Sequence, residues 1–214
     1  MSGLWKSKLK HKREAPASCV GRRLTGGVFI SSSLAQAAAE AGFEEIVLPS
    51  LEPASIYTEK AGPEILGQMY TFPDKKGRTL CLRPEGTATC QILADTVWKS
   101  ERNIELWYLT TCWRYERPQA GRYREFLQFG VEVLNPRPDR NVRSELLGLA
   151  ENMIRLFTTE YEVNAAAKRG LAYYVEDGFE ISCPKLGAQK QVCGGGSYKQ
   201  GCGFAFGVDR LMLL

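Results

Sequence analysis

The 214-residue chain has little of what metal and nucleophilic chemistry usually require. It has one histidine, His11, close to its N-terminus, and its seven cysteines form no Cys-x-x-Cys pair. Structural zinc sites need clustered cysteine and histidine ligands, so no such site is expected. Because His11 is the one histidine, a Ser-His or Cys-His catalytic pair would require the N-terminal segment to fold back onto the rest of the chain. Chemistry in this protein should therefore rest on Arg, Glu, Gln, Tyr and bound metal.

Long apolar runs are also absent. No segment approaches the roughly 18 to 20 apolar residues that a membrane-spanning helix needs, and the N-terminus lacks the apolar core of a secretory signal. We therefore expect a cytoplasmic protein with reduced thiols and no membrane partner. With 44% hydrophobic residues, the chain can bury the core of one ordinary domain.

The net charge of +4 is small, and much of the excess lies in residues 6–13. This pattern predicts a basic flexible tail over residues 1–20 and one folded domain over residues 21–214. The tail could contact nucleic acid, but a solvated arm is the more economical interpretation.

The pattern of apolar residues, glycines and prolines predicts an α+β fold, in which an antiparallel sheet is flanked by helices. Helices are expected at residues 31–41 with serine caps and a closing Gly42, near 63–69, at 86–99 and at 141–160. Strands are expected at residues 45–49, 70–72, 79–83, 171–175, 178–182, 191–193 and 204–206, with a turn at 74–77.

Residues 113–132 are the most informative stretch, because they place charges on a face that should be half-buried. With a period of two, residues 106, 108, 110, 112, 114 and 116 share one face of a strand, and residues 126, 128, 130 and 132 share one face of the next. The connecting loop holds three arginines, which suit bidentate phosphate contacts. An anionic or zwitterionic ligand is predicted there; a solvated sheet face is the alternative.

This run, Arg114-Tyr-Glu-Arg-Pro-Gln-Ala-Gly-Arg-Tyr-Arg-Glu-Phe, resembles motif 2 of class II aminoacyl-tRNA synthetases, in the form found in histidyl-tRNA synthetases. Three further segments resemble that family in the expected order. Leu82-Arg-Pro-Glu-Gly-Thr87 is similar to its ammonium-binding loop, Arg169-Gly-Leu-Ala-Tyr-Tyr174 to its histidine-specific segment, and Gly203-Phe-Ala-Phe-Gly-Val-Asp-Arg-Leu211 to motif 3.

The resemblance implies a class II synthetase-like sheet and ATP-dependent activation of an amino acid, with Mg²⁺ bridging the phosphates and no dedicated metal site on the protein. It implies catalytic roles for Arg114, Arg169 and Arg210; ATP binding by Arg114, Glu116, Arg122, Phe126 and Arg210; and amino-acid binding by Glu85, Thr87, Gln128, Glu132, Tyr173 and Tyr174. Each arginine could instead form a structural salt bridge, and the two tyrosines could be an aromatic pair in the core.

Some positions depart from the family pattern. Ala172 stands where an aspartate is usual, Val175-Glu176 replaces Thr-Gly, and Ser197 replaces an arginine. Only 36 residues separate Glu132 from Arg169, so the family's helical insertion should not fit there, and no anticodon-binding domain is expected after Arg210. Histidine is the expected amino acid, and the acceptor is tRNA or another acyl acceptor.

Two further expectations follow from the resemblance. A short strand ending at Pro49 resembles motif 1, which implies a homodimer joined through residues 41–49. The alternative to an enzyme is a non-catalytic paralogue that senses histidine or regulates a partner, as the synthetase-like regulatory subunit of ATP phosphoribosyltransferase does.

Overall fold

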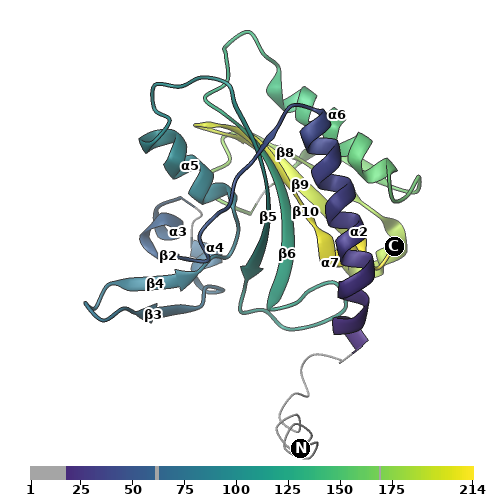
Figure 1. The fold of residues 1–214 in the computed structure, drawn as a ribbon, viewed down its shortest axis with the longest axis horizontal. Coiled ribbons are helices and arrows are strands. Elements are labelled where there is room, and N and C mark those ends of the chain that lie inside the picture. The colour runs from purple at the N-terminus through teal and green to yellow at the C-terminus, as the bar shows by residue number, and fades with distance from the viewer. Residues whose placement is uncertain (1–17, 61–62, 169) are drawn as a thin grey trace, which may run out of the picture.

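The structure, a computed structural model, describes residues 18–60, 63–168 and 170–214 (Figure 1). Its main feature is a seven-stranded sheet in the order β1-β5-β6-β10-β9-β8-β7. The strands are β1 (Glu44–Glu45), β5 (Ile104–Trp113), β6 (Glu125–Leu134), β7 (Glu162–Ala167), β8 (Gly178–Ser182), β9 (Gln191–Tyr198) and β10 (Gly201–Gly207). All neighbouring pairs are antiparallel except β1 and β5. The predicted α+β class with an antiparallel sheet flanked by helices is confirmed.

The central hairpin of β5 and β6 sets the two faces of the sheet. Its register pairs Cys112 with Phe126 and Thr110 with Gln128, so the predicted polar positions of both strands share one face. The opposite face carries Phe129 and Val131, which are fully buried. The alternation expected from the sequence is therefore present in this hairpin.

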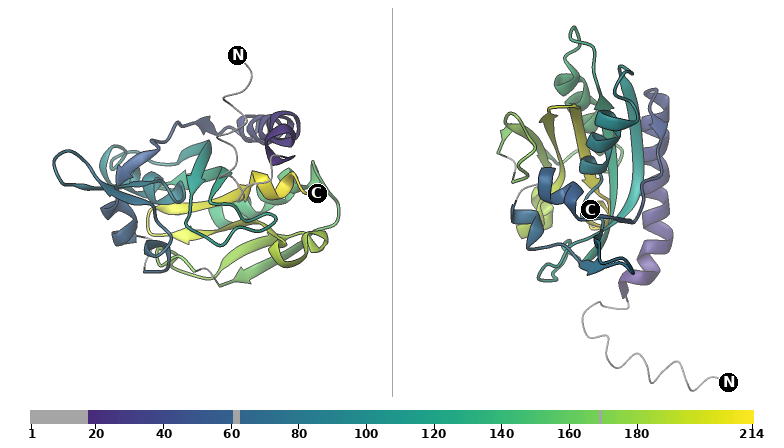
Figure 2. Two further views of the ribbon diagram at one scale, coloured as in Figure 1. Left: turned by 90° about the horizontal axis from the view of Figure 1, so that it is seen from below. Right: turned by 90° about the vertical axis from the view of Figure 1, so that its left-hand side faces the viewer.

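Two long helices cover the apolar face. Helix α2 (Ser18–Glu40) and helix α6 (Val142–Arg155) both contribute to one core cluster with β6, β8 and β10 (Figures 1 and 2). Helix α6 begins at Asn141, whose side chain accepts a hydrogen bond from Ser144 N. The short helix α7 (Val208–Leu211) packs against α2. The packing is close at Gly27, where an added Cβ atom would lie 3.2 Å from Met212 Sδ.

A smaller subdomain faces the polar side of the sheet. It contains β2 (Leu51–Pro53), β3 (Thr71–Pro73) and β4 (Thr79–Leu82), with α3 (Ser55–Lys60), α4 (Pro63–Leu66) and α5 (Thr87–Thr96). Tyr108 joins it to the sheet, because its ring lies between Gly86 and Gly130. A Cβ atom at either glycine would lie within 2.6 Å of that ring, so only glycine leaves room for it.

The helix expected at residues 31–41 is part of a longer helix, because α2 runs from Ser18 to Glu40. The serines at the predicted start lie inside α2, and Ser33 Oγ donates to Phe29 O at 2.9 Å instead of capping. Gly42 does close the helix: its φ is +92°, and Phe43 N donates to Ala38 O. Residues 1–17, including His11, lie outside the described residues.

Several other boundaries differ from the sequence prediction. Residues 171–175 form a turn with one isolated bridge, Tyr174 to Tyr198, instead of a strand. The strand predicted at residues 45–49 is reduced to the two residues of β1. Helix α3 and the 3₁₀ helix η2 (Pro184–Gln189) were not predicted. Strands β9 and β10 are longer than expected. Strand β7 was also missed, because its Asn-Ala-Ala-Ala run has low β propensity.

Among the described residues, no helix is both long and apolar enough to cross a lipid bilayer.

Candidate functional site

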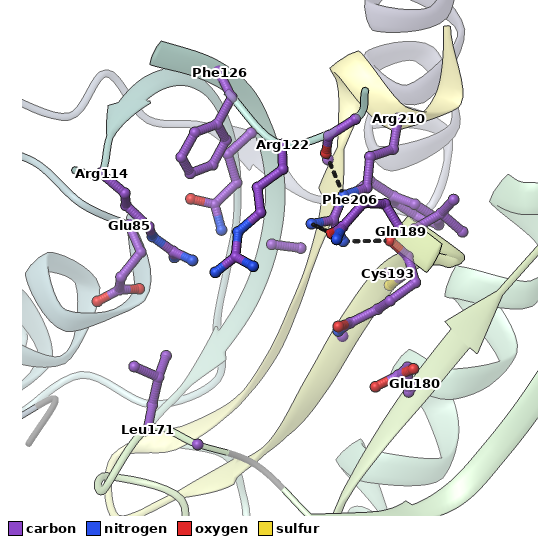
Figure 3. Close-up of a pocket in the computed structure, with 18 of the residues that line it drawn as sticks. Glu85, Arg114, Arg122, Phe126, Leu171, Glu180, Gln189, Cys193, Phe206 and Arg210 are labelled. Atoms are coloured by element: carbon purple, nitrogen blue, oxygen red, sulfur yellow. Dashed lines mark hydrogen bonds between the residues drawn. The ribbon is translucent and has the colours of Figure 1, made fainter. Parts of the chain in front are cut away.

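A pocket of about 610 Å³ opens on the polar face of the sheet (Figure 3). Its walls come from the β5–β6 loop, the start of α5, residues 168 and 170–174, β9, β10 and α7. Ten of the predicted site residues line it: Glu85, Thr87, Arg114, Glu116, Arg122, Phe126, Gln128, Tyr173, Tyr174 and Arg210. The structure therefore brings together segments that are far apart in the sequence.

Arg114 lies at the end of β5 and points into the pocket beside Glu85 (Figure 3). Its Nε donates to Pro84 O at 2.8 Å, which fixes the side chain against the loop before α5. Its guanidinium also lies 5.2 Å from the centroid of the Phe126 ring. The guanidinium is thus held by a hydrogen bond at Nε and by the Phe126 ring. Its two terminal nitrogens point toward the cavity (Figure 3).

Arg122, in the loop between β5 and β6, pairs with Glu116 of the same loop. The Arg122 side chain is 40% exposed, whereas that of Glu116 is 10% exposed. A partly exposed ion pair of this kind contributes little to stability. The pair instead orients the Arg122 guanidinium over the cavity, between Arg114 and Arg210 (Figure 3).

Arg210 enters the pocket from α7 and is held by three uncharged oxygens. It donates to Gly121 O at 2.7 Å, to Gln191 O at 2.6 Å and to Gln189 Oε1 at 3.1 Å. Burial lowers the pKa of Arg210, and the positive charges of Arg114 and Arg122 lower it further. Three cations in one partly desolvated cavity repel one another, so a polyanion placed among them would be stabilised.

Glu85 provides the opposite charge at the far end of the pocket. Its carboxylate accepts hydrogen bonds from Thr87 N at 2.6 Å and Ala88 N at 2.9 Å, at the N-terminus of α5. The side chain is 1% exposed, and burial raises its pKa, although these backbone donors and Arg114 act in the opposite direction. Tyr173 lies above it, with its hydroxyl 3.5 Å from Glu85 Oε2.

Glu132 does not line the pocket with the other predicted ligands. Its side chain is fully buried beneath the pocket floor, where it accepts hydrogen bonds from Thr87 Oγ1 at 2.6 Å, Tyr198 OH at 2.6 Å and Tyr108 OH at 3.3 Å. Burial raises the pKa of Glu132 to about 7, against the lowering effect of these hydroxyl donors. The carboxylate fits there because Gly203 opposite has no side chain, and a Cβ would lie 1.7 Å from Glu132 Oε2.

Tyr198 was not singled out from the sequence, although it connects Glu132 to the aromatic wall. Its ring forms an edge contact with Tyr173 at 6.1 Å, and Tyr173 in turn packs on Tyr174 at 4.6 Å. The sequence did contain a signal for Tyr198, because it ends the glycine-rich strand β9, and residues without side chains let neighbouring groups approach closely. Gln189, which holds Arg210, gave no signal in the sequence. Arg169 lies outside the described residues.

Comparisons with known proteins show which family this chain resembles. The sequence profile described as histidyl-tRNA synthetase matches residues 29–160. A histidine–tRNA ligase of Methanosarcina acetivorans is 26% identical over 303 aligned positions, which cover 92% of this chain and 72% of that protein. Because the alignment is longer than the 214-residue chain, the relative has residues with no counterpart here.

Solved structures show the same fold. The apo histidyl-tRNA synthetase of S. aureus superposes with a TM-score of 0.70 at 25% identity, covering 86% of this chain and 64% of that one. A protein of Bacillus halodurans, described as an ATP phosphoribosyltransferase regulatory subunit/histidyl-tRNA synthetase, has a TM-score of 0.70 at 17% identity, covering 86% of this chain and 77% of that one. With a profile match over more than half of its length, the chain belongs to the histidyl-tRNA synthetase family.

Proposed function

We propose that this protein activates an amino acid with ATP, and that the amino acid is histidine. One observation carries the proposal: Arg114, Arg122 and Arg210 converge on a pocket that also holds the Phe126 ring and the buried carboxylate of Glu85. The guanidinium groups suit a triphosphate, the ring suits stacking on a base, and the carboxylate suits an ammonium group.

The reaction needs positioning more than covalent help from the protein. The substrate carboxylate oxygen attacks the α-phosphorus of ATP, a new oxygen–phosphorus bond forms, and the bond to the leaving pyrophosphate breaks. Negative charge builds on phosphate oxygens, and Arg114 at the inner end and Arg210 at the outer end would stabilise it. The proposed role of Arg169 at the α-phosphate carries over from the family.

Mg²⁺ would reach the site with the nucleotide. Among the described residues, no group of three or more His, Cys, Asp or Glu side chains is arranged to hold a metal ion. A magnesium ion bound mainly by phosphate oxygens and water is compatible with such a pocket. Bound there, it would neutralise charge on the phosphates.

For the amino acid, the proposed ammonium ligands are Glu85, Thr87 and Gln128, which line one part of the pocket. Tyr173 and Tyr174 form the wall beside them and would contact the imidazole. Glu132, also proposed to read the ring, could act from beneath this wall through the hydroxyl of Tyr198. A site with these polar groups would discriminate against side chains that cannot form hydrogen bonds.

The proposed acceptor of the adenylate is tRNA or another acyl acceptor. In the structure, α6 and β7 occupy the sequence between Glu132 and Arg169, where an additional tRNA-binding insertion would have to lie. An acceptor stem would then contact mainly the arginines of the β5–β6 loop, and its binding should weaken steeply with salt.

A histidine-sensing or regulatory paralogue is the second candidate. It is favoured by the fold shared with the Bacillus halodurans protein and by the departures Ala172, Glu176 and Ser197. The retained Arg114, Arg122 and Arg210 favour the enzyme, because a sensor of histidine alone needs no cluster of phosphate ligands.

Pyrophosphate exchange with each of the twenty amino acids tests the proposal. We expect exchange with histidine, and a loss of about two to three orders of magnitude in Arg114→Ala, on the scale of a lost oxyanion donor. Arg155→Ala is the matched control, because Arg155 pairs with Glu151 on α6, away from the pocket. Histidine binding by calorimetry without exchange for any amino acid would favour the regulatory candidate.

A further inference from the structure

A second buried polar cluster lies behind the pocket and takes no part in lining it. It consists of Glu52 on β2, Tyr57 on α3 and Thr89 on α5, whose exposed fractions are 2%, 0% and 6%. None of the three is among the residues that line the pocket. Buried carboxyl and hydroxyl groups are costly unless they are hydrogen-bonded, so an ordinary apolar core would not need this cluster.

The cluster forms a connected set of hydrogen bonds that ends on the pocket loop. Tyr57 OH contacts the Glu52 carboxylate, Thr89 Oγ1 at 3.3 Å and the main-chain oxygen of Glu85 at 3.3 Å. Thr89 Oγ1 also donates to Glu52 Oε1 at 2.7 Å. Residues of β2, α3 and α5 are thereby linked to the backbone of Glu85 through the hydroxyl of Tyr57.

The loop that carries Glu85 is consequently held on two sides. On the pocket side, Arg114 Nε donates to Pro84 O at 2.8 Å, and on the far side Tyr57 contacts Glu85 O. The Glu85 carboxylate then accepts from Thr87 N and Ala88 N. Its direction into the pocket depends on the placement of the two peptide units that flank its Cα atom, and each of these contacts holds one of them.

The number of hydrogens explains why both Glu52 and Tyr57 are needed. A phenol has one hydrogen, so Tyr57 alone cannot satisfy Glu52 and Glu85 O together. Burial raises the pKa of Glu52, and the hydrogen bonds from Tyr57 and Thr89 and the charge of Arg83 act in the opposite direction. A protonated Glu52 can donate to the Tyr57 oxygen while Tyr57 donates to Glu85 O, and each group then has a partner.

We propose that Glu52 and Tyr57 are positioning residues that hold Glu85 in the orientation in which it binds the substrate ammonium group. The inference rests on the proposed function for the role of Glu85, and it adds two residues that contact no substrate themselves.

The test uses Tyr57→Phe, which removes one hydroxyl and keeps the buried ring. In pyrophosphate exchange, its KM for the amino acid should rise on the order of tenfold, the scale of one lost buried hydrogen bond, while its KM for ATP stays unchanged. Glu52→Ala should do the same, and Glu52→Gln, which keeps both a donor and an acceptor, should restore most of the affinity. Tyr161→Phe is the matched control, because Tyr161 contacts Glu151 Oε2 at 3.3 Å on α6.

A second readout does not depend on activity. Tyr57→Phe should speed amide hydrogen exchange at Thr87 and Ala88, whose N–H groups bind the Glu85 carboxylate, and leave the exchange of α6 unchanged. If the wild-type protein shows no pyrophosphate exchange, the proposed function fails, and this readout still decides whether Tyr57 holds the Glu85 loop. Unchanged exchange at Thr87 and Ala88, or equal rises in both KM values, would overturn the positioning role.

Discussion

Glu132 should make the folded protein less stable as the pH rises toward neutrality, and Glu132→Gln should remove this effect. The carboxyl group has an ordinary pKa of 4.5, and burial raises it to about 7 in the folded chain. Between these values the folded state binds more protons than the unfolded state, so its stability falls as pH increases and becomes level above about 7. Stability is lost because free energy is needed to ionise a carboxyl group that has no exposed surface.

The size of the effect follows from the two pKa values. Each unit of pKa difference corresponds to about 1.4 kcal/mol, so between pH 5 and pH 8 Glu132 should lower the free energy of unfolding by about 2 to 3 kcal/mol. For a chain of 214 residues this corresponds to roughly 5 to 10 °C in the melting temperature. Glu52 and Glu85, whose pKa values burial also raises, act in the same direction in both proteins.

Urea unfolding of the wild type and Glu132→Gln at pH 5 and pH 8 measures the difference. Glutamine can keep the contacts, because the hydroxyls of Thr87 and Tyr198 can each donate or accept. The wild type should lose about 2 to 3 kcal/mol more than the variant between the two pH values. Glu101→Gln, at an exposed position, serves as the control and should follow the wild type. Parallel behaviour of the wild type and Glu132→Gln would refute the reasoning.

Three further predictions concern packing, specificity and assembly. Gly130→Ala should destabilise by about 1 to 3 kcal/mol in thermal unfolding, because its Cβ would lie 2.1 Å from the Tyr108 ring, whereas Gly148→Ala in α6 has open space and should stabilise by about 0.5 to 1 kcal/mol. Glu132→Gln should raise the KM for histidine far more than the KM for ATP, and equal changes would argue against a role in reading the imidazole. Sedimentation should give about twice 23.9 kDa, and Val47→Glu should shift it toward the monomer, because Val47 lies in the segment expected to join the dimer and is 87% exposed in the single chain.

Local pattern determined much of this protein. The alternation along residues 104–134 fixed the β5–β6 hairpin and its two faces, because a strand alternates its side chains wherever it lies. Gly42 and the turn at residues 74–77 were predictable for a similar reason: both contain a glycine with positive φ, a conformation that is costly for other residues. Of the ten predicted ligands that line the pocket, nine lie in the four motifs, and Gln128 follows on the strand after motif 2.

Other features depended on contacts between segments that are distant in the sequence. Residues 171–175 have the apolar, aromatic composition of a strand, yet they form a turn because the two tyrosines pack at the pocket wall beside Tyr198. Strand β7 has one β-branched residue, Val163, and depends on β8 for its hydrogen-bond partners. Secondary structure that depends on a partner strand leaves little signal in the local sequence.

The sequence by itself determined the family, the polar face of the central hairpin and the residue types of the pocket, because these depend on short motifs and on the period of a strand. Only the tertiary structure decided that Glu132 lies beneath the floor and that Glu52 and Tyr57 support the Glu85 loop. Both arrangements join residues separated by about 30 to 70 positions, and both depend on burial, which raises the cost of an unpaired polar group. A sequence gives the chemical groups, but their burial and partners are set by how the elements pack.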